Sequence, residues 1–376
     1  MKTARRNSHR FAVIIAGGRG SRFWPLSRPQ RPKQLLRIFS RKSLIKETTD
    51  RIVPLFGREN TLVITVANHY SSVRKELHTL PKANILVEPQ GNNTAPCIGF
   101  AATELDARDP DAVMTVLPAD HWISDVKSFG RTIKAAIQVV QAHEALLTIG
   151  IRPGYPETGY GYILKGNKLK GSKGLRLYEV KSFKEKPTLK KAGQLIQLGS
   201  LWNSGIFVWR ASTLLSSLQR FIPSLSGCLQ RIREQTQGSG LGTPRPKIRA
   251  LIQKEYKRMP NISIDHAVLE KAGSEGKVLT LEANFGWSDI GNWAAVHRML
   301  PRDRNGNAGV GKWVAFKSSD CLVYSPKRLV TLLGLEKTVV VDTSDALLVA
   351  DITRAQEVKD LVDELQQKGY RRQTDK

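Results

Sequence analysis

Cysteine is scarce in this chain. Only three cysteines occur in 376 residues, and they are far apart, odd in number and without a CxxC spacing: Cys97, Cys228 and Cys321. This pattern excludes a disulfide framework and a thiolate metal site, and it is typical of a reducing compartment. We therefore predict a cytoplasmic protein.

Long apolar runs are also absent. No run reaches the roughly 18 apolar residues that a bilayer-spanning helix requires, so a membrane protein is not expected. Lys2, Arg5 and Arg6 precede an apolar run and imitate a signal peptide, but that run is too short and leads into glycines. We interpret residues 1–10 as a basic tail that leads into a first strand.

Acidic residues are few, 33 against 59 basic ones, which gives a formal net charge of +26. The excess is regional: residues 1–60 hold 15 basic and 3 acidic side chains, residues 161–191 hold 10 and 2, and residues 231–258 hold 8 and 2. Such windows suit phosphate-rich substrates or a nucleic acid, while solvated surface charge is the third interpretation. Hydrophobic content of 40% predicts a folded chain, and its length favours two domains or one large domain with an appendage.

The first 150 residues alternate short apolar runs with amphipathic stretches. Strands are predicted at 11–16, 61–66, 84–87, 113–117 and 146–149, and helices at 43–52, 68–78, 94–108 and 126–143. This alternation indicates an α/β fold with a doubly wound, mostly parallel sheet. In such sheets ligands bind beyond the carboxyl ends of the strands.

The rhythm changes after residue 150. Strands predicted at 162–164, 175–183 and 205–209 suggest an inserted, partly antiparallel layer that covers the sheet edge, and residues 235–246 predict a loop. From about 305 to 350, short β segments recur at 313–316, 321–324, 330–333, 339–342 and 346–350. Stacked turns, a sandwich and a short β-helix all fit their spacing. A helix over 355–368 ends the pattern.

A glycine-rich segment directly follows the first strand. Its sequence is AGGRGSRFWPLSR over 16–28, followed by PKQ over 32–34. Backbone N–H groups of Gly17, Gly18 and Gly20, with Ser21, can wrap around phosphate oxygens. Arg22 and Lys33 add charge-assisted contacts. The segment is neither a Walker A loop nor a dinucleotide fingerprint, because it lacks Gly-Lys-Ser/Thr and the last glycine of GxGxxG.

This segment resembles the signature of the sugar-1-phosphate nucleotidyltransferases, and it is most similar to their mannose-1-phosphate guanylyltransferase branch. Seven more motifs follow in the family's order: EPQGNNTAP at 88–96, LPADH at 117–121, GYGYI at 159–163, FKEKP at 183–187, WNSG at 202–205, SID at 263–265 and GWSDIG at 286–291. The resemblance implies a Rossmann-like nucleotidyltransferase domain over 11–300 and a C-terminal β segment with a closing helix over 301–376.

Two aspartates are the predicted metal ligands. Asp120 follows an apolar run and so lies at the carboxyl end of a strand, where one or two carboxylates hold a Mg²⁺ that bridges nucleotide phosphates. Asp289 is the natural second ligand. A turn or N-cap role is the alternative for each, and the joint match to the family favours the metal. His121 is interpreted as a packed neighbour, because Mg²⁺ prefers oxygen.

The base and the sugar phosphate have their own candidates. The Glu88 carboxylate can accept hydrogen bonds from N1–H and the exocyclic amine of guanine, and Asn93 and Thr94 follow it at a predicted helix start, where either also fits an N-cap. The family usually has Arg where this chain has Asn92, which bears on base choice. For the sugar phosphate, the resemblance implies four residues: Gly161, Glu185, Lys186 and Asn203. A solvated basic face is the alternative for Lys186, and site and cap weigh equally for Asp265.

The resemblance implies the transfer of a guanylyl group from GTP to mannose 1-phosphate, with Mg²⁺ as cofactor and with Arg22, Lys33 and Asp120 in the catalytic role. A sugar 1-phosphate is largely dianionic at neutral pH, because its second pKa is near ~6, so it needs no general base. Another sugar 1-phosphate with UTP, dTTP or ATP, and a non-catalytic relative that binds nucleotide sugar or nucleic acid, are the alternatives. Nucleic-acid binding is not expected, a homodimer is left open, and no isomerase activity is expected.

Overall fold

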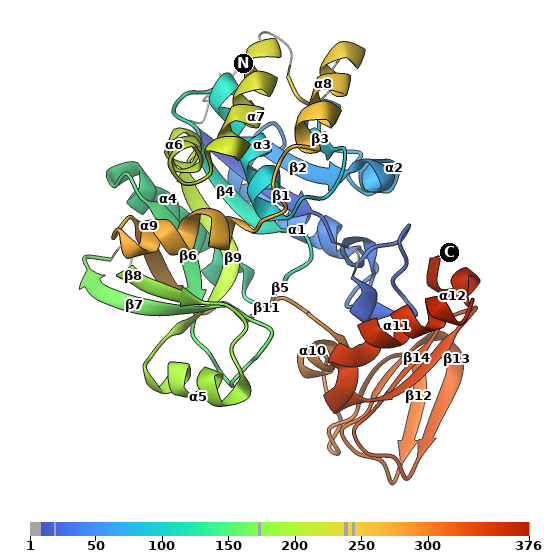
Figure 1. Ribbon diagram of the computed structural model, residues 1–376. Helices are drawn as coiled ribbons and strands as arrows, with labels where there is room; N and C mark the ends of the chain where they lie inside the picture. Colours follow the sequence, from blue (N-terminus) through green and yellow to red (C-terminus); the bar gives the residue numbers. More distant parts are fainter. Residues whose placement is uncertain (1–8, 19, 172–173, 237–239, 243–244, 376) are drawn as a thin grey trace, which may run out of the picture.

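A computed structural model describes residues 9–18, 20–171, 174–236, 240–242 and 245–375. Its centre is a nine-stranded sheet with the order β3-β2-β1-β4-β9-β6-β10-β8-β7 (Figure 1). The strands are β1 (Arg10–Ala16), β2 (Thr61–Val66), β3 (Ile85–Glu88), β4 (Val113–Pro118), β6 (Leu146–Ile151), β7 (Tyr162–Leu169), β8 (Arg176–Lys184), β9 (Leu201–Arg210) and β10 (Val278–Ala283).

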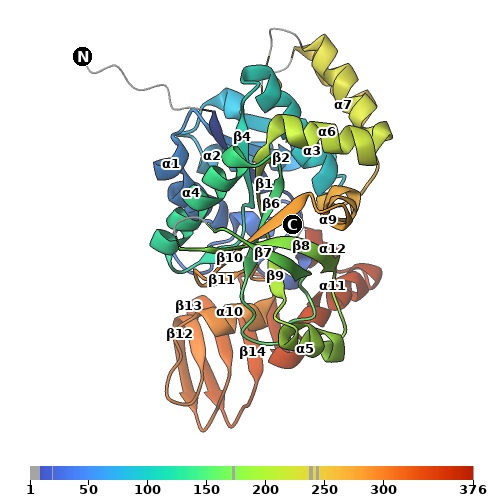
Figure 2. The ribbon, with the colours of Figure 1, turned by 90° about the vertical axis from the view of Figure 1, so that its left-hand side faces the viewer.

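The first four strands confirm the predicted parallel pairing. β3, β2, β1 and β4 pair in parallel, and β1 lies between β2 and β4 with Ile14 opposite Val63 and Leu117. Their continuous apolar runs arise because both faces of the sheet are covered. Figure 2 shows helices on either side of this sheet.

Two separate hydrophobic cores lie on the two faces of the sheet. One packs against α1 (Leu44–Phe56), α2 (Tyr70–Glu76), α4 (Val126–Ala142) and α5 (Leu189–Gln197). The other packs against α3 (Thr94–Arg108), α6 (Ala211–Phe221), α7 (Pro223–Gln235), α8 (Pro246–Tyr256) and α9 (Glu270–Ser274). This double cover confirms the doubly wound α/β fold. Within the described residues, no helix has the length and apolar character needed to cross a membrane.

The predicted antiparallel layer over the sheet edge is wrong in part. β9 lies inside the sheet, antiparallel to β4 on one side and to β6 on the other. Most of its residues are buried, because helices cover both of its faces. β7 and β8 do extend the sheet at its edge, where β8 pairs antiparallel with β10. The inserted strands therefore complete the central sheet.

A second sheet follows the connecting helix α10 (Trp293–Met299). Its strands are β12 (Ala308–Phe316), β13 (Leu322–Leu333), β14 (Thr338–Asp342) and β15 (Leu347–Asp351). The first three pair in parallel and β15 is antiparallel, so the segments predicted at 321–324 and 330–333 are parts of one strand. The helices α11 (Val358–Gln367) and α12 (Arg371–Asp375) close the chain.

Some predicted features lie outside the described residues. These are most of the basic tail over 1–10 and, within the loop predicted over 235–246, residues 237–239 and 243–244.

Candidate active site

The glycine-rich segment begins where β1 ends. Gly18 and Gly20 have φ angles of 104° and 66°, which favour glycine because it has no Cβ. A Cβ on Gly20 would lie 2.5 Å from Cβ of Lys33, so this position also has no space for a side chain. Ser27 Oγ donates to the carbonyl of Gly20 at 2.7 Å. The loop then enters a 3₁₀ turn, η1 (Ser21–Phe23).

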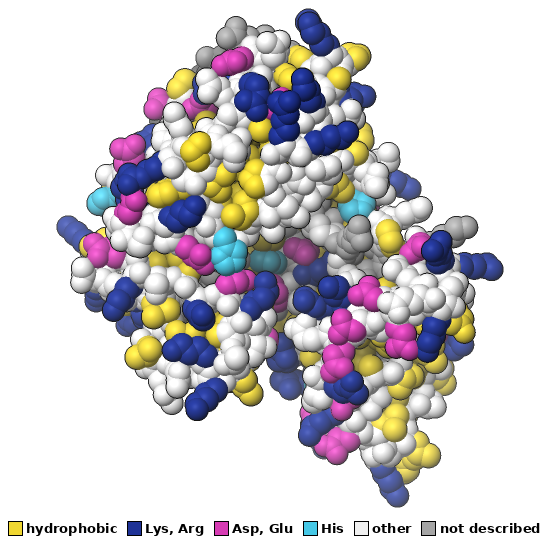
Figure 3. All heavy atoms as spheres, in the orientation of Figure 1, with side chains coloured by type: hydrophobic (Ala, Val, Ile, Leu, Met, Phe, Trp, Pro, Cys, Tyr) yellow, Lys and Arg dark blue, Asp and Glu magenta, His cyan; other side chains and the backbone are white. Residues whose placement is uncertain are grey.

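A pocket of about 430 Å³ lies against this loop. Every residue predicted for the phosphate cradle and the metal lines it: Gly17, Gly18, Gly20, Ser21, Arg22, Lys33, Asp120 and Asp289. Its other lining residues are Phe23, Gln34, Gly291 and Lys359. Figure 3 shows acidic and basic side chains around the hollow between the main body and the C-terminal sheet. The fold thus brings together residues that are more than 300 positions apart in the sequence.

Two very short strands bring the two aspartates into this pocket. β5 (Trp122–Ile123) follows Asp120 closely, and β11 (Trp287–Ser288) directly precedes Asp289. These strands pair antiparallel, with Trp122 opposite Ser288. The pairing fixes the second aspartate near the carboxyl end of β4, where the first one lies. The sequence alone shows both aspartates but not this pairing.

Lys33 links the two aspartates. Its Nζ lies 2.9 Å from Oδ2 of Asp120 and also donates to the backbone carbonyl of Asp289. Burial raises the pKa of the Asp120 carboxyl, but the adjacent ammonium of Lys33 outweighs this effect and holds the pKa below its ordinary value. Asp120 is therefore an anion at neutral pH and offers oxygen ligands to a cation.

Tyr160 and His121 support the two aspartates. Tyr160 Oη donates to Oδ1 of Asp289 at 2.8 Å, and burial with the charge of Asp289 raises the pKa of this phenol, so it stays protonated. His121 accepts at Nδ1 from Nε1 of Trp287 at 3.1 Å. Burial lowers the pKa of His121 to about 4, so its ring is neutral. This confirms His121 as a packed, hydrogen-bonded neighbour.

The residues predicted for the sugar phosphate form a second cluster around Gly161. Asn203 N donates to the carbonyl of Gly161 at 2.8 Å, and a Cβ on Gly161 would lie 2.5 Å from Oε2 of Glu185. Lys186 N donates to the carbonyl of Tyr160 at 3.2 Å. Because Tyr160 also holds Asp289, this cluster is connected to the pocket through one residue.

The side chains of this cluster are polar and closely coupled. Asn203 Nδ2 donates to Oδ1 of Asp265 at 2.7 Å, and Lys186 Nζ lies 3.0 Å from Oε1 of Glu185. Burial raises the pKa of Asp265 to about 6, and the charge of Glu185 adds to this shift. No side-chain cap is formed by Asp265, which instead contacts Asn203. Such a group of acceptors and donors suits the hydroxyls of a sugar.

Glu88 is located elsewhere. It is 4% exposed, it does not line the pocket, and Cys97 and Tyr256 are its buried neighbours. Burial raises the pKa of its carboxyl to about 7, and no described residue donates a hydrogen bond to its Oε1. The prediction that Glu88 contacts guanine gains no support from this location and stays a prediction.

The loop between β3 and α3 makes its contacts inside the fold. Asn92 Nδ2 donates to the carbonyls of Tyr256 and Met259 at 2.7 and 3.3 Å, so this side chain fastens the loop to the end of α8. Thr94 Oγ1 accepts from Ile264 N at 2.8 Å. Asn93, at φ 67°, is exposed, and its Oδ1 accepts from Thr94 N, which confirms it as the N-cap of α3.

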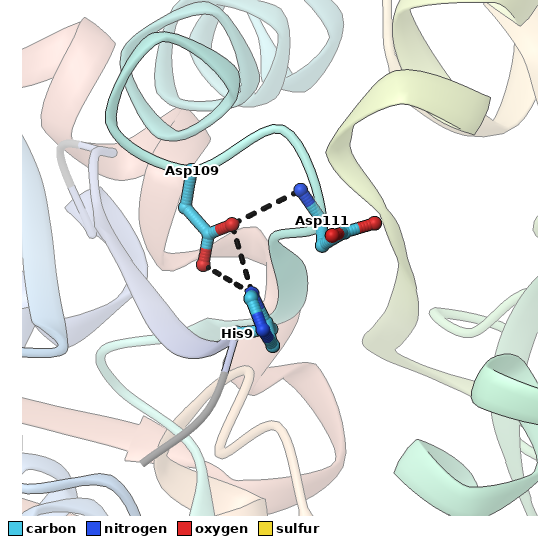
Figure 4. Close-up of side chains that lie close together, drawn as sticks. All are labelled: His9, Asp109 and Asp111. Carbon is cyan, nitrogen blue, oxygen red and sulfur yellow. Dashed lines mark hydrogen bonds and ion pairs between the residues drawn. The ribbon is translucent and has the colours of Figure 1, made fainter. Parts of the chain in front are cut away.

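An exposed acidic cluster lies at the other end of β1. Figure 4 shows Asp109 accepting from the backbone N of Asp111 and from the ring of His9, whose Nδ1 lies 2.9 Å from both of its oxygens. These three groups lie close enough together to hold a metal ion. However, His9 lies just before β1 and the glycine loop lies just after β1. The length of this seven-residue strand therefore separates the cluster from the pocket by about 20 Å.

The pocket suits a divalent metal better than this cluster does. Asp120 and Asp289 both line it and present carboxylate oxygens, the donors that hard cations prefer. The ammonium of Lys33, 2.9 Å from Oδ2 of Asp120, keeps that carboxylate ionised, which a metal ligand requires. The nucleotidyltransferases that this sequence resembles generally use a divalent metal.

Three lining or supporting residues of the site have no role predicted from the sequence: Tyr160, Gln34 and Lys359. Tyr160 stands within the GYGYI motif, so the motif match could have pointed to it, and Gln34 donates from Nε2 to the carbonyl of Ala16 at 3.2 Å, which fixes the start of the glycine loop. Lys359 belongs to α11, more than 300 residues from the loop it faces. No signal in the sequence links it to the pocket.

The comparisons with known proteins agree with this geometry. The nucleotidyl transferase family model matches residues 11–305, and the model of the mannose phosphate isomerase/GMP-like β-helix domain matches residues 311–365. Among the three architectures that the C-terminal spacing left open, the parallel strands and this match indicate a short β-helix.

Several relatives are similar over most of the chain. The mannose-1-phosphate guanylyltransferases of Escherichia coli and Klebsiella pneumoniae are each 38% identical over 359 residues, which is 94% of this chain and 74% of theirs. A crystal structure described as mannose-1-phosphate geranyltransferase from Thermus thermophilus is 31% identical, with a TM-score of 0.84 over 96% of this chain and 100% of that one. The chain therefore belongs to the nucleotidyl transferase family, within its mannose-1-phosphate guanylyltransferase branch.

Proposed function

We propose that this protein transfers a guanylyl group from GTP to mannose 1-phosphate, which yields GDP-mannose and pyrophosphate. The observation that carries the proposal is one pocket in which the glycine loop, Arg22, Lys33 and two carboxylates converge next to the Gly161 cluster. Relatives of that activity, 38% identical over 94% of the chain, support the choice of base and sugar.

The pocket binds the triphosphate. Backbone N–H groups of the glycine loop and the guanidinium of Arg22 hold phosphate oxygens, and Lys33 neutralises charge near the α-phosphate. An oxygen of the sugar phosphate attacks the α-phosphorus in line, the bond between that phosphorus and the bridging oxygen to the β-phosphorus breaks, and pyrophosphate leaves. The reacting groups are anions that repel each other, so positioning and charge neutralisation provide most of the catalysis.

Asp120 and Asp289 are the residues that would hold Mg²⁺. Held by these two carboxylates, the ion would offset the negative charge of the phosphates. Tyr160 keeps Asp289 in place through its 2.8 Å hydrogen bond, and Lys33 does the same for Asp120. No side chain needs to remove a proton, because the attacking phosphate is already ionised.

The Gly161 cluster binds mannose 1-phosphate. Glu185 and Asn203 are placed to hydrogen-bond sugar hydroxyls, and the absence of a side chain at Gly161 leaves room for the Glu185 carboxylate, which would lie 2.5 Å from a Cβ there. Lys186, whose side chain is 64% exposed, can leave Glu185 and meet the phosphate group. The phosphate of the substrate then points toward the pocket, which is next to this cluster because Tyr160 contacts both Lys186 and Asp289.

The sequence also predicts Asn93, Thr94 and Glu88 as nucleotide-binding residues near the start of α3. Asn93 is the exposed member and the one that can reach a nucleotide directly, whereas Thr94 and Glu88 have contacts inside the fold. A cytoplasmic location belongs to the same proposal, and the three buried, free thiols support it. A homodimer stays a prediction.

A panel of substrates tests the proposal. Purified protein is incubated with Mg²⁺, one of four nucleoside triphosphates, and mannose 1-phosphate or glucose 1-phosphate, and pyrophosphate release is measured. We expect the highest kcat/KM with GTP and mannose 1-phosphate. Higher turnover with another pair would reassign the substrates, and no release with any pair, together with salt-dependent binding of RNA or DNA, would indicate a non-catalytic relative.

A further inference from the structure

The C-terminal domain is seated directly against the glycine loop. Phe23, Trp24 and Leu26 of the segment after the loop share one buried core with side chains of β13, β14 and α11. Trp24 Nε1 donates to the carbonyl of Gln373 at 2.9 Å, and Arg28, which is buried, lies 3.2 Å from Asp345. The core and these contacts fix the closing helices relative to the phosphate cradle (Figure 1).

The packing of α11 against this core places one of its lysines, Lys359, in the wall of the pocket. Val358 and Val362 of that helix are buried in the shared core, while Lys359, between them in the sequence, is exposed and lines the pocket with Gly17, Gly18 and Ser21. In a helix, neighbouring residues point about 100° apart, so burial of Val358 turns Lys359 out of the core. The pocket thus has a wall that comes from the C-terminal domain.

The ion pairs in the pocket show which basic side chains are available to bind an anionic ligand. Lys33 is paired with Asp120 at 2.9 Å, whereas Arg22 and Lys359 have no ion-pair partner among the described residues. Asp120 and Asp289 line the same pocket, but neither forms a direct ion pair with Arg22 or Lys359. A nucleoside triphosphate carries about four negative charges near neutral pH, more than the glycine loop and Lys33 balance alone.

We propose that Lys359 of the C-terminal domain binds the β- and γ-phosphates of the nucleotide, and the pyrophosphate that they become. The inference rests on the proposed function, and it extends the site beyond the nucleotidyltransferase domain. Lys359 lies with the glycine loop and is not part of the Gly161 cluster. It therefore contacts the leaving group and leaves the sugar phosphate to Lys186. The C-terminal domain is then a component of the active site in addition to a structural support.

Three variants of the full chain test this role. Lys359→Met removes the charge at similar length, Lys359→Arg restores a cation, and Lys368→Met is the matched control, because Lys368 follows α11, pairs with Glu364 at 2.7 Å and does not line the pocket. We expect Lys359→Met to weaken the binding of inorganic pyrophosphate, measured by calorimetry, by about tenfold or more, since a charge-assisted hydrogen bond is lost. Lys359→Arg should recover most of this loss, and Lys368→Met should match the wild type.

Kinetics separate a binding role from a structural one. In pyrophosphorolysis of GDP-mannose, Lys359→Met should raise the KM for pyrophosphate while the KM for GDP-mannose stays within about twofold. Unchanged pyrophosphate affinity would overturn the proposal, as would an equal loss for all substrates that arginine fails to rescue. Calorimetry needs no turnover, so weakened pyrophosphate binding in a protein that forms no GDP-mannose would refute the proposed reaction and leave this site intact.

Discussion

The pocket at the carboxyl end of β1 and the loop between β3 and α3 differ in what their polar side chains contact. In the pocket, Arg22 has no ion-pair partner among the described residues, and Asp289 lies at the surface of the cavity. In the loop, Asn92 Nδ2 donates to two backbone carbonyls and Thr94 Oγ1 accepts from a backbone N–H, and all three backbone groups lie within residues 256–264. Both segments match motifs of one family, yet the first presents its side chains to the cavity, whereas Asn92 and Thr94 of the second present theirs to the fold.

This contrast shows that a motif match does not distinguish residues that bind a ligand from residues that hold the backbone in place. A side chain can be kept in a motif because it touches substrate or because it fixes the backbone that does. Burial and hydrogen-bond partners separate these roles, and they are properties of the fold. If the comparison is right, substitutions in the pocket should reduce turnover, and substitutions in the loop should reduce stability.

The largest effect is expected in the pocket, from Asp120→Asn. This change keeps the shape of the side chain but removes its charge. We expect kcat to fall by at least about 10²-fold, because the Mg²⁺ that would offset the negative charge of the transition state loses a ligand. The melting temperature should change little. Turnover near that of the wild type would reject Asp120 as a ligand.

The matched control for this prediction is Asp109→Asn. Asp109 belongs to the exposed cluster with His9 and Asp111 at the far end of β1. If the metal acts at the pocket, this variant should keep wild-type kcat and the Mn²⁺ binding seen by electron paramagnetic resonance, whereas Asp120→Asn should lose that binding. The reverse pattern would place the metal at His9.

Glu88→Gln tests whether Glu88, which ends the strand before the loop, is a buried structural residue. The readout is the pH dependence of the free energy of unfolding. The carboxyl pKa is raised from 4.5 to about 7 by burial, so the folded state holds a proton that the unfolded state releases. In the wild type, the contribution of Glu88 to the free energy of unfolding is therefore fully present below pH 4.5 and is lost as the pH rises through about 7. Because Gln cannot titrate, the variant should lack this term, which amounts to about 3 kcal/mol.

Urea unfolding of both proteins between pH 4.5 and 8 measures the difference, and GTP kinetics are the second readout. We expect the KM for GTP and the preference for GTP over ATP to stay within about threefold of the wild type. A large rise in KM for GTP with unchanged pH dependence would instead show that Glu88 contacts the base, and the contrast between pocket and loop would then fail.

The sequence could predict most of the fold and the pocket for a physical reason. Continuous apolar runs mark parallel strands that are buried on both faces, and parallel strands place their carboxyl ends on one edge. Gly20 and Asp120 follow such ends, so their convergence could be expected. Lys359 could not be expected, because its place depends on how a distant core around Trp24 packs.

The position of β9 shows a second limit. Its sequence predicts a strand, but a strand's partners depend on which edge is free when the chain returns, and period-two patterning carries no information on this. The orientation of Glu88 shows a third. A carboxylate at a strand end can face the crevice or the core, and only its neighbours Cys97 and Tyr256 identify the core.

Asn92→Ala should lower stability and leave the nucleotide kinetics unchanged. The amide donates to the carbonyls of Tyr256 and Met259, and both are left without this donor in the variant. Loss of such buried hydrogen bonds costs about 1–3 kcal/mol. Urea unfolding at constant pH measures the cost. An unaltered unfolding midpoint together with a changed KM for GTP would mean that this position acts on the nucleotide, where the family usually has arginine.

The smallest effect is expected from Thr94→Val, which replaces one hydroxyl with a methyl group of similar size. Thr94 Oγ1 accepts from Ile264 N, so its removal leaves one backbone donor without this partner, at a cost of about 1 kcal/mol. Thr103→Val is the control on the same helix, because its hydroxyl only donates to the carbonyl of Gly99 within α3. If Thr94 braces the loop, the KM for GTP should stay at the wild-type value in both variants. A rise confined to Thr94→Val would extend the nucleotide site to the start of α3.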